Sequence, residues 1–513
     1  MREPAYIEGF IGGVSFANEV RDFVHDYLTV QNYRDETIPQ LAAELPAAEG
    51  GTWVVKPDGT MDVTWRLRPN IRWHDGTPFT SSDMAFSYQL YKDPEHSSGA
   101  TAMLNQMIGV DAPDPLTYVV HYARADARAL QAEGLVPLPR HLLEPIYLND
   151  RPNFINSPKF SNEWVGLGPY KIARWEPGSY LELERFDDYF LGRPPLDRVI
   201  IRFFFDTNAM STAMLAEGFE VAIPGGIDLD SAVAIRDRWA GTGNLVRIEA
   251  IPRITDMEIQ YRAELSRPVN GLRDRTVRQA FFQAINREQL MEVMTLGLGA
   301  VADSWFPPND PNRVAVEPFI PRYPFDPQAA LRLLADAGWT RRPDGILVHT
   351  SGERFVAELR TIPQYGEKPA VVIASNWKDI GADMSVWAIP QARASERELN
   401  ASQTFAKVNG SYLDALFDRL DSRLIASAAN RWTGRNLSGW GNPRYDEILD
   451  RLAVTIDPEE RFALLREQSM IVMGDLARFP LYWEPRPILA LKSVKADLYP
   501  YNTTWNVFEW DKQ

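Results

Sequence analysis

Residues 73–87 read WHDGTPFTSSDMAFS and carry the most specific structural signal in this chain of 513 residues. Gly76 permits a tight turn, because glycine adopts positive φ angles without steric penalty. Thr80 and Asp83 have the spacing of a capping box, in which an N-cap residue and an acid three positions later satisfy free backbone N–H groups. The stretch therefore predicts a turn followed by a helix through Phe86.

The segment before this stretch has the pattern of a β-hairpin. Val63, Trp65 and Leu67 alternate with polar residues, which is the period-2 pattern of a half-buried strand. The sequence Pro-Asp-Gly at 57–59 separates this strand from the apolar residues 53–55. Proline presets φ and glycine supplies a positive φ, so residues 57–59 are predicted to form the turn of the hairpin.

Four segments later in the chain begin with residues that favour helix N-termini. The predicted N-caps are Asp274, Asn286, Asp326 and Asp457, each followed by apolar residues at helical spacing. Proline follows Asp326 and Asp457, at the first helical position, where its missing N–H is not needed. Together with the strands, these helices predict a mixed α/β chain.

Composition excludes several classes of protein. Asp+Glu 69 against Lys+Arg 54 gives a net charge of −15, which disfavours nucleic acid and anionic membranes as partners. The chain has no cysteine, so disulfides, thiolate metal sites and cysteine nucleophiles are excluded. No stretch approaches the ~18 consecutive apolar residues of a membrane-spanning helix. The length predicts roughly three domains or subdomains.

A search for catalytic motifs finds no Gly-x-Ser-x-Gly elbow, no phosphate-binding loop and no His-Glu-x-x-His. The six histidines are scattered, and we expect no metal and no cofactor. One enzymatic alternative stays open, a glycan-acting hydrolase that uses a carboxylate pair. Its two acids must lie several ångströms apart in space, and a sequence with 69 acids does not reveal that distance.

Tryptophan is the residue type that most suggests a ligand site. Trp305, Trp432 and Trp440 lie in polar or turn-rich surroundings rather than on clean amphipathic stripes. An indole offers a wide apolar face and one N–H donor, which suits sugars, peptide side chains and aromatic ligands. The competing interpretation of each is half-buried packing.

The quoted stretch resembles the signature of the family 5 extracellular solute-binding proteins, the dipeptide-, oligopeptide- and nickel-binding components of bacterial ABC importers. In that family the His-Asp-Gly segment is architectural rather than catalytic. The resemblance continues in order along more than 400 residues. Further matching segments are Leu41-Ala42-Ala43-Glu44, Gly166-Leu167-Gly168-Pro169-Tyr170, 187–195, 274–287, 323–339 and Asn442-Pro443-Arg444-Tyr445-Asp446.

The resemblance implies an α/β, two-lobed periplasmic-binding-protein-like fold (type II, cluster C), with an extra subdomain inserted in the first lobe. Lobe I is expected to be discontinuous and to comprise 1–38, 163–250 and 475–513. The extra subdomain is expected at 39–162 and lobe II at 251–474. A hinge between the lobes is expected to close over the ligand.

The same resemblance implies a receptor without catalytic residues that delivers its solute to the permease subunits of an ABC importer. We expect a periplasmic or extracellular, membrane-anchored location, with the leader absent from this chain. We also expect a monomer that binds a small-molecule, peptide or oligosaccharide ligand and no nucleic acid.

The sequence departs from the family at the expected ligand site. Peptide binders carry a Trp-x-x-Asp-Tyr-x-Asp-Pro-like stretch whose first aspartate pairs with the peptide α-amine. The matching residues 408–415 read VNGSYLDA, so Ser411 replaces that aspartate. A buried ammonium without its carboxylate loses a charge-assisted pair. We therefore expect an oligopeptide-like ligand without a free amine, or a neutral polar or aromatic ligand such as an oligosaccharide.

The nickel branch of the family is disfavoured, because no histidine falls between His141 and His349 or after His349. The candidate ligand contacts combine the altered stretch with polar and aromatic residues from both lobes. They are Asn18, Trp305, Tyr365, Asn409, Ser411, Trp432 and Trp440.

Overall fold

The computed structural model describes residues 18–513 except 94, 96–103, 105, 131–134, 205, 309, 363–365 and 413–416. Contacts between residues divide the chain into two compact units. Unit 1 comprises Met1–Arg247, Ala453–Thr455 and Pro487–Gln513, and unit 2 comprises Ile248–Leu452 and Ile456–Arg486. The chain passes from one unit to the other within two long strands, β11 (Leu245–Ile259) and β18 (Arg478–Ala490).

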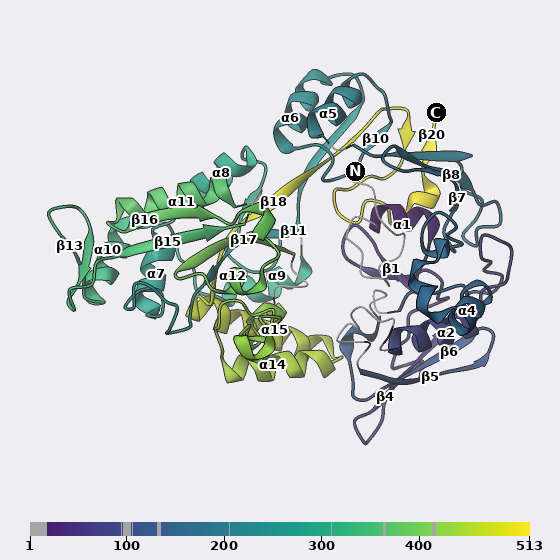
Figure 1. Ribbon diagram of the computed structural model, residues 1–513, viewed down its shortest axis with the longest axis horizontal. Helices are drawn as coiled ribbons and strands as arrows, with labels where there is room; N and C mark the ends of the chain where they lie inside the picture. Colours follow the sequence, from purple (N-terminus) through teal and green to yellow (C-terminus); the bar gives the residue numbers. More distant parts are fainter. Residues whose placement is uncertain are drawn as a thin grey trace. The chain divides into compact units, whose positions relative to one another are not determined.

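Unit 1 is built from antiparallel sheets with helices packed on them (Figure 1). Its helices are α1 (Asn18–Val24), α2 (Ser81–Lys92), α4 (Arg140–Asn149), α5 (Thr207–Leu215) and α6 (Leu229–Arg238). Its strands are β1 (Thr29–Gln31), β2 (Thr37–Pro39), β3 (Trp53–Val55), β4 (Met61–Arg66), β5 (Met107–Asp114), β6 (Thr117–Tyr122), β7 (Tyr170–Glu176), β8 (Tyr180–Arg185), β9 (Arg198–Arg202), β10 (Val221–Ala222), β19 (Val494–Lys495) and β20 (Asp511–Lys512). The two larger sheets have the strand orders β3-β4-β6-β5 and β7-β8-β9, and α2 packs against β5 and β6.

The predicted hairpin and capped helix are confirmed. β3 and β4 pair antiparallel with Trp53 opposite Val63, and Gly59 in the turn has a φ of 86°. The Thr80 N–H donates to Asp83 Oδ2 at 2.8 Å, and α2 begins at the next residue. The side chain of Phe86 is buried, as the helical pattern requires.

His74 joins the quoted stretch to the distant Gly-x-Gly-Pro-Tyr segment. Gly166 N–H donates to His74 Nδ1 at 3.1 Å, so the other ring nitrogen, Nε2, carries the proton and donates to Gly168 O at 3.0 Å. Burial lowers the pKa of His74 to about 4, which keeps the ring neutral. Both nitrogens are occupied by backbone groups, so this histidine is architectural.

Glycine is required at both ends of this bridge because the backbone of α1 approaches so closely. A Cβ added at Gly166 would lie 1.8 Å from Val24 O, and one added at Gly168 would lie 2.4 Å from His25 N. The glycines therefore allow residues 166–168 to pack directly against the end of α1.

Unit 2 is a mixed α/β layer structure. Its helices are α7 (Arg275–Gln283), α8 (Arg287–Thr295), α9 (Pro311–Val316), α10 (Pro327–Asp336), α11 (Glu367–Asp379), α12 (Arg397–Ala401), most of α14 (Pro443–Val454) and α15 (Pro458–Asp475). Its own strands are β12 (Ala300–Val301), β13 (Trp339–Arg341), β14 (Leu347–His349), β15 (Val356–Thr361), β16 (Asp383–Ala388) and β17 (Ala406–Tyr412). The predicted caps are confirmed, because the side chains of Asp274, Asn286, Asp326 and Asp457 each accept a backbone N–H at the start of α7, α8, α10 and α15.

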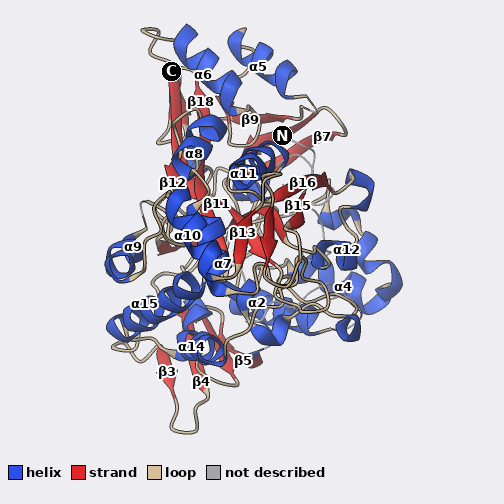
Figure 2. Ribbon diagram, turned by 90° about the vertical axis from the view of Figure 1, so that its left-hand side faces the viewer, coloured by secondary structure: helices blue, strands red, loops and turns tan. Residues whose placement is uncertain are grey.

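The main sheet of unit 2 has the order β18-β11-β17-β15-β16, with β12 paired to β18. β15 runs parallel to β16 and β17, whereas β11 and β17 are antiparallel. α11 connects β15 to β16 and packs on both, and α7 lies beside α10 (Figure 2). An aromatic group fills the core of the unit, in which the Phe281 ring lies 4.6 Å from Phe355, 5.2 Å from Trp377 and 5.6 Å from Phe405 between ring centroids.

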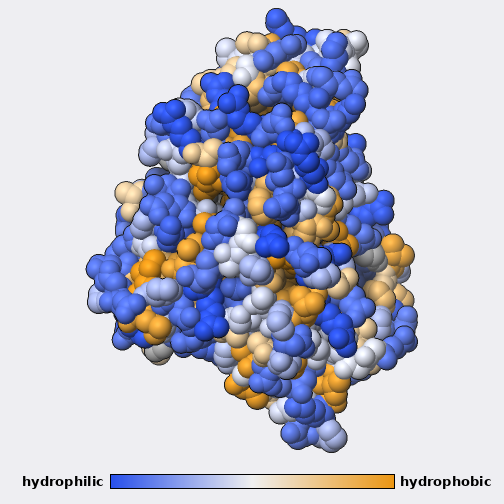
Figure 3. Space-filling view, turned by 90° about the vertical axis from the view of Figure 1, so that its right-hand side faces the viewer, coloured by the Kyte–Doolittle hydropathy of each residue, from blue (hydrophilic) through white to orange (hydrophobic). Residues whose placement is uncertain are grey.

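The face drawn in Figure 3 is dominated by hydrophilic residues, with small, separated hydrophobic patches. Among the helices that the structure describes, none is both long enough and apolar enough to cross a membrane. The division into two units leaves the assignment of 39–162 as a separate subdomain a prediction.

Candidate functional site

Polar and charged residues gather on one face of the unit 2 sheet where β11 and β17 pair. The register sets Glu258 opposite Lys407 and Asp256 opposite Asn409, and it sets Ser411 one pair further along that face. Alternate residues of a strand point to the same side, so these five side chains share one face. Four of the five are buried, and Asn409 is partly buried.

Four buried ions form the centre of this face, and we call Asp256, Glu258, Lys407 and Arg478 the charge cluster. Arg478 Nε donates to Asp256 Oδ2 at 2.6 Å, and its Nη1 donates to Glu258 Oε1 at 3.1 Å. Lys407 Nζ lies 2.9 Å from the other oxygen of Glu258. None of the four is more than 1% exposed. Each carboxylate has a cation, and the formal charges of the cluster sum to zero.

The pKa shifts follow from burial and from these pairs. Burial alone would raise the pKa of Glu258, but the cations Lys407, Arg478 and Arg419 lower it to about 2. Burial raises the pKa of Asp256, which shares Arg478 with the like-charged Glu258. Burial lowers the pKa of Lys407, and Glu258 opposes that shift. The two carboxylates are thus committed to internal cations, and neither is an unpaired anion for an external ammonium.

Two uncharged residues border the charge cluster. Asn409 Nδ2 donates to Glu258 Oε1 at 3.3 Å, and Ser411 Oγ donates to Asp256 Oδ1 at 3.2 Å. Arg419 Nη1 donates to Ser411 Oγ at 3.0 Å. The structure therefore brings together Asn409 and Ser411 of the seven predicted contacts and adds Arg419 beside them.

Trp305 and Trp440 lie within the hydrophobic core of unit 2. Trp305 is 1% exposed and Trp440 is 3% exposed. The indole N–H of Trp440 donates to Asp475 Oδ2 at 2.6 Å, and its ring meets Tyr445 edge-on at 5.2 Å between centroids. This burial favours packing for both tryptophans, and their contact with a ligand stays a prediction.

The remaining three predicted contacts lie elsewhere. Trp432 is partly buried with a left-handed φ of 59°, and the guanidinium of Arg262 lies 5.9 Å from its ring centroid. Asn18 is the first residue of α1 in unit 1. Tyr365 lies outside the described residues. The roles of Asn18, Tyr365 and Trp432 stay predictions.

The charge cluster and Arg419 were not predicted from the sequence. A local signal exists for part of it, because Asp256 and Glu258 alternate with Met257 and Ile259 in a strand-like pattern. Charged residues at the inward positions of such a strand indicate that cations face them. Their partner Arg478 is 222 residues away in the chain from Asp256, so the sequence does not identify it.

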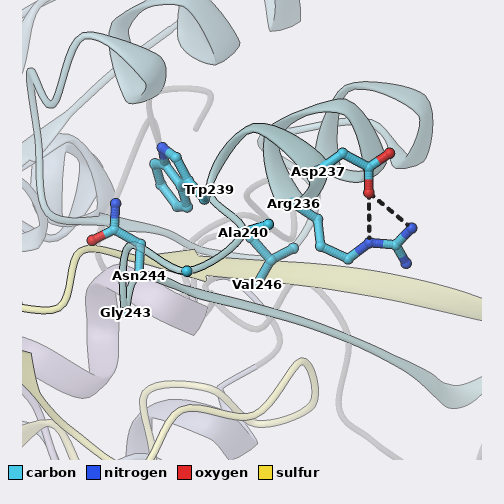
Figure 4. Close-up of a pocket in the computed structure, with 8 residues that line it drawn as sticks. Arg236, Asp237, Trp239, Ala240, Gly243, Asn244 and Val246 are labelled. Carbon is cyan, nitrogen blue, oxygen red and sulfur yellow. Dashed lines mark hydrogen bonds and ion pairs between the residues drawn. The ribbon is translucent and has the colours of Figure 1, made fainter.

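A separate hollow of about 620 Å³ lies in unit 1 beside α6 (Figure 4). Its lining includes Trp239, Asn244 and an ion pair between Arg236 and Asp237. Asn244 Oδ1 already accepts the backbone N–H of Lys492 at 2.9 Å. None of the predicted contacts that the structure describes lines this hollow, and the side chains of Arg236, Asp237 and Asn244 already have partners, so we do not assign the ligand to it.

Comparison with known proteins decides the family. The model of the bacterial extracellular solute-binding proteins, family 5, matches residues 36–422, well over half of the chain. The chain belongs to this family. It is a solute-binding receptor of a bacterial ABC importer and not an enzyme, and it works with the permease subunits of such an importer.

The relatives extend over almost the whole chain. The oligopeptide-binding protein AppA of Bacillus subtilis is 24% identical over 524 residues, which cover 99% of this chain and 90% of AppA. The structure of that protein with a nonapeptide matches with a TM-score of 0.75 at 20% identity, covering 100% of this chain and 97% of the other. NikZ of Campylobacter jejuni in complex with Ni(L-His) matches with a TM-score of 0.77 at 22% identity, covering 100% and 98%.

These structural matches confirm the predicted two-lobed α/β fold of the periplasmic binding proteins. NikZ forms a complex with Ni(L-His), but the described part of this chain contains no group of three His, Asp or Glu side chains placed to hold a metal ion.

Proposed function

We propose that this receptor binds a peptide-like solute whose recognition does not depend on a free α-ammonium group. The relative AppA is named for oligopeptides and its structure contains a nonapeptide, which supports the peptide class. The charge cluster supports the second part of the proposal. At the position where the peptide binders carry an aspartate, this chain has Ser411, and both nearby carboxylates already pair with Lys407 and Arg478.

An incoming ammonium would have to compete with these internal cations. Breaking a buried pair leaves an uncompensated charge and costs about 3–5 kcal/mol. A blocked or neutral terminus avoids that penalty and can still hydrogen-bond to polar groups such as the Asn409 amide. The internal charge balance is the observation that carries the proposal.

The domain assignment belongs to the same proposal. Lobe I would comprise 1–38, 163–250 and 475–513, the extra subdomain 39–162, and lobe II 251–474. The chain passes between the two units at 247–248, within β11, and at 486–487, within β18, which supports a hinge formed by these two strands. We further propose that the receptor is a monomer held at the outer face of the membrane.

Neither an oligosaccharide nor a hydrolase has support comparable to that of a peptide. The indoles of Trp305 and Trp440 are covered by core packing and do not offer free faces for a sugar. The carboxylates of the charge cluster are fully buried and paired with cations, whereas a glycosidase needs an acid with a raised pKa that reaches its substrate.

A thermal-shift experiment tests the proposal. Purified receptor is screened against pentapeptides with free N-termini, the same peptides N-acetylated, a set of oligosaccharides, and nickel with histidine. A ligand at 100-fold its Kd stabilises the folded state by about 2.7 kcal/mol, which raises Tm measurably.

We expect the acetylated peptides to raise Tm at least as much as the free ones. A shift with free-amine peptides alone would refute the claim about the ammonium. A shift with oligosaccharides alone would refute the peptide class.

A further inference from the structure

We propose that Arg419 anchors an anionic group of the ligand, so that this receptor selects peptide-like solutes carrying a carboxylate where an ordinary peptide carries its α-ammonium. This inference rests on the proposed function and names the substrate class of the same site. It reverses the sign of charge that the site would recognise.

The hydrogen bonding of Arg419 leaves most of its capacity unused. A guanidinium has five N–H donors and no acceptor. Within the described residues, Ser411 Oγ accepts the hydrogen bond of Arg419, through Nη1 at 3.0 Å. Ser411 is a neutral hydroxyl that is itself 1% exposed and bonded to Asp256, so it fixes one edge of the guanidinium without neutralising it. The Arg419 side chain is partly exposed, so a ligand can reach it.

The described acids near Arg419 are already paired. Asp256 and Glu258 belong to the charge cluster, which sums to zero without Arg419. Asp421, two residues further along, accepts from Arg423 Nε at 2.8 Å and from Arg423 Nη2 at 2.7 Å. Counting the described residues only, one positive charge is therefore left over at this end of the charge cluster.

The segment that carries Arg419 is held firmly. It is the short helix η8 (Phe417–Leu420), in which Phe417 O accepts the Tyr445 hydroxyl at 2.8 Å. The Phe417 ring packs against Phe306 at 5.9 Å between centroids, and Leu420 is 2% exposed. These contacts fix the backbone that carries Arg419, and the bond to Ser411 restricts the guanidinium, which reduces the entropy lost when a ligand binds.

A carboxylate suits this site for two reasons. The planar guanidinium can donate two parallel hydrogen bonds to a carboxylate, and such charge-assisted bonds are about twice as strong as neutral ones. An ammonium in the same place would face a like charge, and among the described residues no unpaired carboxylate offsets it.

The test uses one pentapeptide-amide pool made in three forms that differ only at the N-terminus. The free form carries an ammonium, the N-acetyl form is neutral, and the N-succinyl form carries a carboxylate. C-terminal amidation removes the competing anion. For wild-type receptor we expect the succinyl form to bind about ten-fold more tightly than the acetyl form, and the free form to bind least well, as measured by calorimetric titration.

Two variants test whether Arg419 produces this ranking. Arg419→Gln removes the charge, and Ser411→Asp places a carboxylate beside the guanidinium and neutralises it. Both are expected to lose the ten-fold preference for the succinyl form over the acetyl form. Arg332→Gln is the matched control, because Arg332 lies on α10 of the same unit with a side chain that is 70% exposed.

The outcomes separate the inference from the proposed function. If the three forms bind with equal affinity, or the free form binds best, the inference is wrong and the peptide class still stands. If the succinyl preference survives in folded Arg419→Gln, another cation is responsible and the inference is likewise wrong. If none of the three forms binds wild-type receptor, the proposed function fails and the inference with it.

Discussion

Replacing Arg478 with methionine should destabilise unit 2 far more than the loss of an ordinary arginine. Arg478 is 1% exposed and is the cation shared by Asp256 and Glu258, at 2.6 and 3.1 Å. Methionine fills much of the same volume, so the main loss is electrostatic. Glu258 keeps Lys407, whereas Asp256 is left in the interior with the Ser411 hydroxyl.

Removing one partner of a buried ion pair costs about 3–5 kcal/mol. A domain of 150–250 residues loses about 2–4 °C of Tm per kcal/mol, so Arg478→Met should lower Tm by roughly 6–20 °C. The comparison is Arg332→Met, an exposed arginine on α10 whose loss should change stability by at most about 0.5 kcal/mol. Differential scanning calorimetry and urea unfolding at pH 7 measure the Tm and the free energy of unfolding of both variants.

The pH dependence of the stability of Arg478→Met is a second, independent test of the electrostatic role of Arg478. In Arg478→Met, burial and the like-charged Glu258 hold the pKa of Asp256 above its unfolded value, and of the two cations that oppose this shift only Arg419 remains. The native state then binds more protons than the unfolded state above the unfolded pKa, so stability falls as pH rises and recovers as pH drops toward 5. The reasoning is refuted if Arg478→Met is as stable as Arg332→Met, or if its deficit is the same at pH 5 and pH 8.

Three further substitutions test other parts of the structure. His74→Ala should lower the free energy of unfolding in urea by about 1–3 kcal/mol, because Gly166 N–H loses its acceptor. The pKa of His74 is about 4 in the folded protein and about 6.5 in the unfolded chain, so between these pH values the unfolded state binds more protons and wild-type protein loses stability as pH falls. This loss should be smaller in the variant, which lacks the imidazole. Gly168→Ala should lower the free energy of unfolding by about 3 kcal/mol or prevent folding, because its Cβ would lie 2.4 Å from His25 N. Gly474→Ala in α15 is the control, since an added Cβ would have no atom within 4 Å, and it should be neutral or stabilising by about 0.5–1 kcal/mol. Equal unfolding midpoints for the two variants would contradict this. Trp440→Ala should cost about 3–5 kcal/mol, because it empties a buried site. The ligand affinity of the folded variant tests the predicted contact: a fall in affinity supports contact with the ligand, and an unchanged affinity assigns Trp440 to packing alone.

The elements that the sequence predicted correctly are those with short-range causes. The hairpin at Gly59, the capped start of α2 and the aspartate caps of α7, α10 and α15 each depend on residues within a few positions of one another. Their physics is local hydrogen bonding and backbone preference, so a single sequence contains it. The family resemblance extended the prediction from local elements to the two-lobed α/β fold, because the segments that match the family occur in the same order along the chain.

The charge cluster could not be predicted because its cause is long-range. Asn409 meets Glu258 across 151 positions, and Arg478 meets Asp256 across 222. No local pattern specifies which strand becomes the neighbour of another. Trp440 illustrates the same limit, since its polar sequence neighbours do not reveal that tertiary packing encloses it and that Asp475 accepts its N–H.

The close approach of Gly166 and Gly168 to Val24 and His25 has a consequence for how this receptor tolerates change. Val24 and Gly166 are in contact, so the two ends of the segment between them are held together. Lengthening a flexible surface loop of this segment costs little closure entropy, about 0.6 kcal/mol for each doubling of the loop length. Insertions, deletions and grafted modules are therefore best tolerated in surface turns of this segment, such as the turn at Gly59. A single extra residue beside Gly166 or Gly168 would disrupt the contact of these glycines with Val24 and His25.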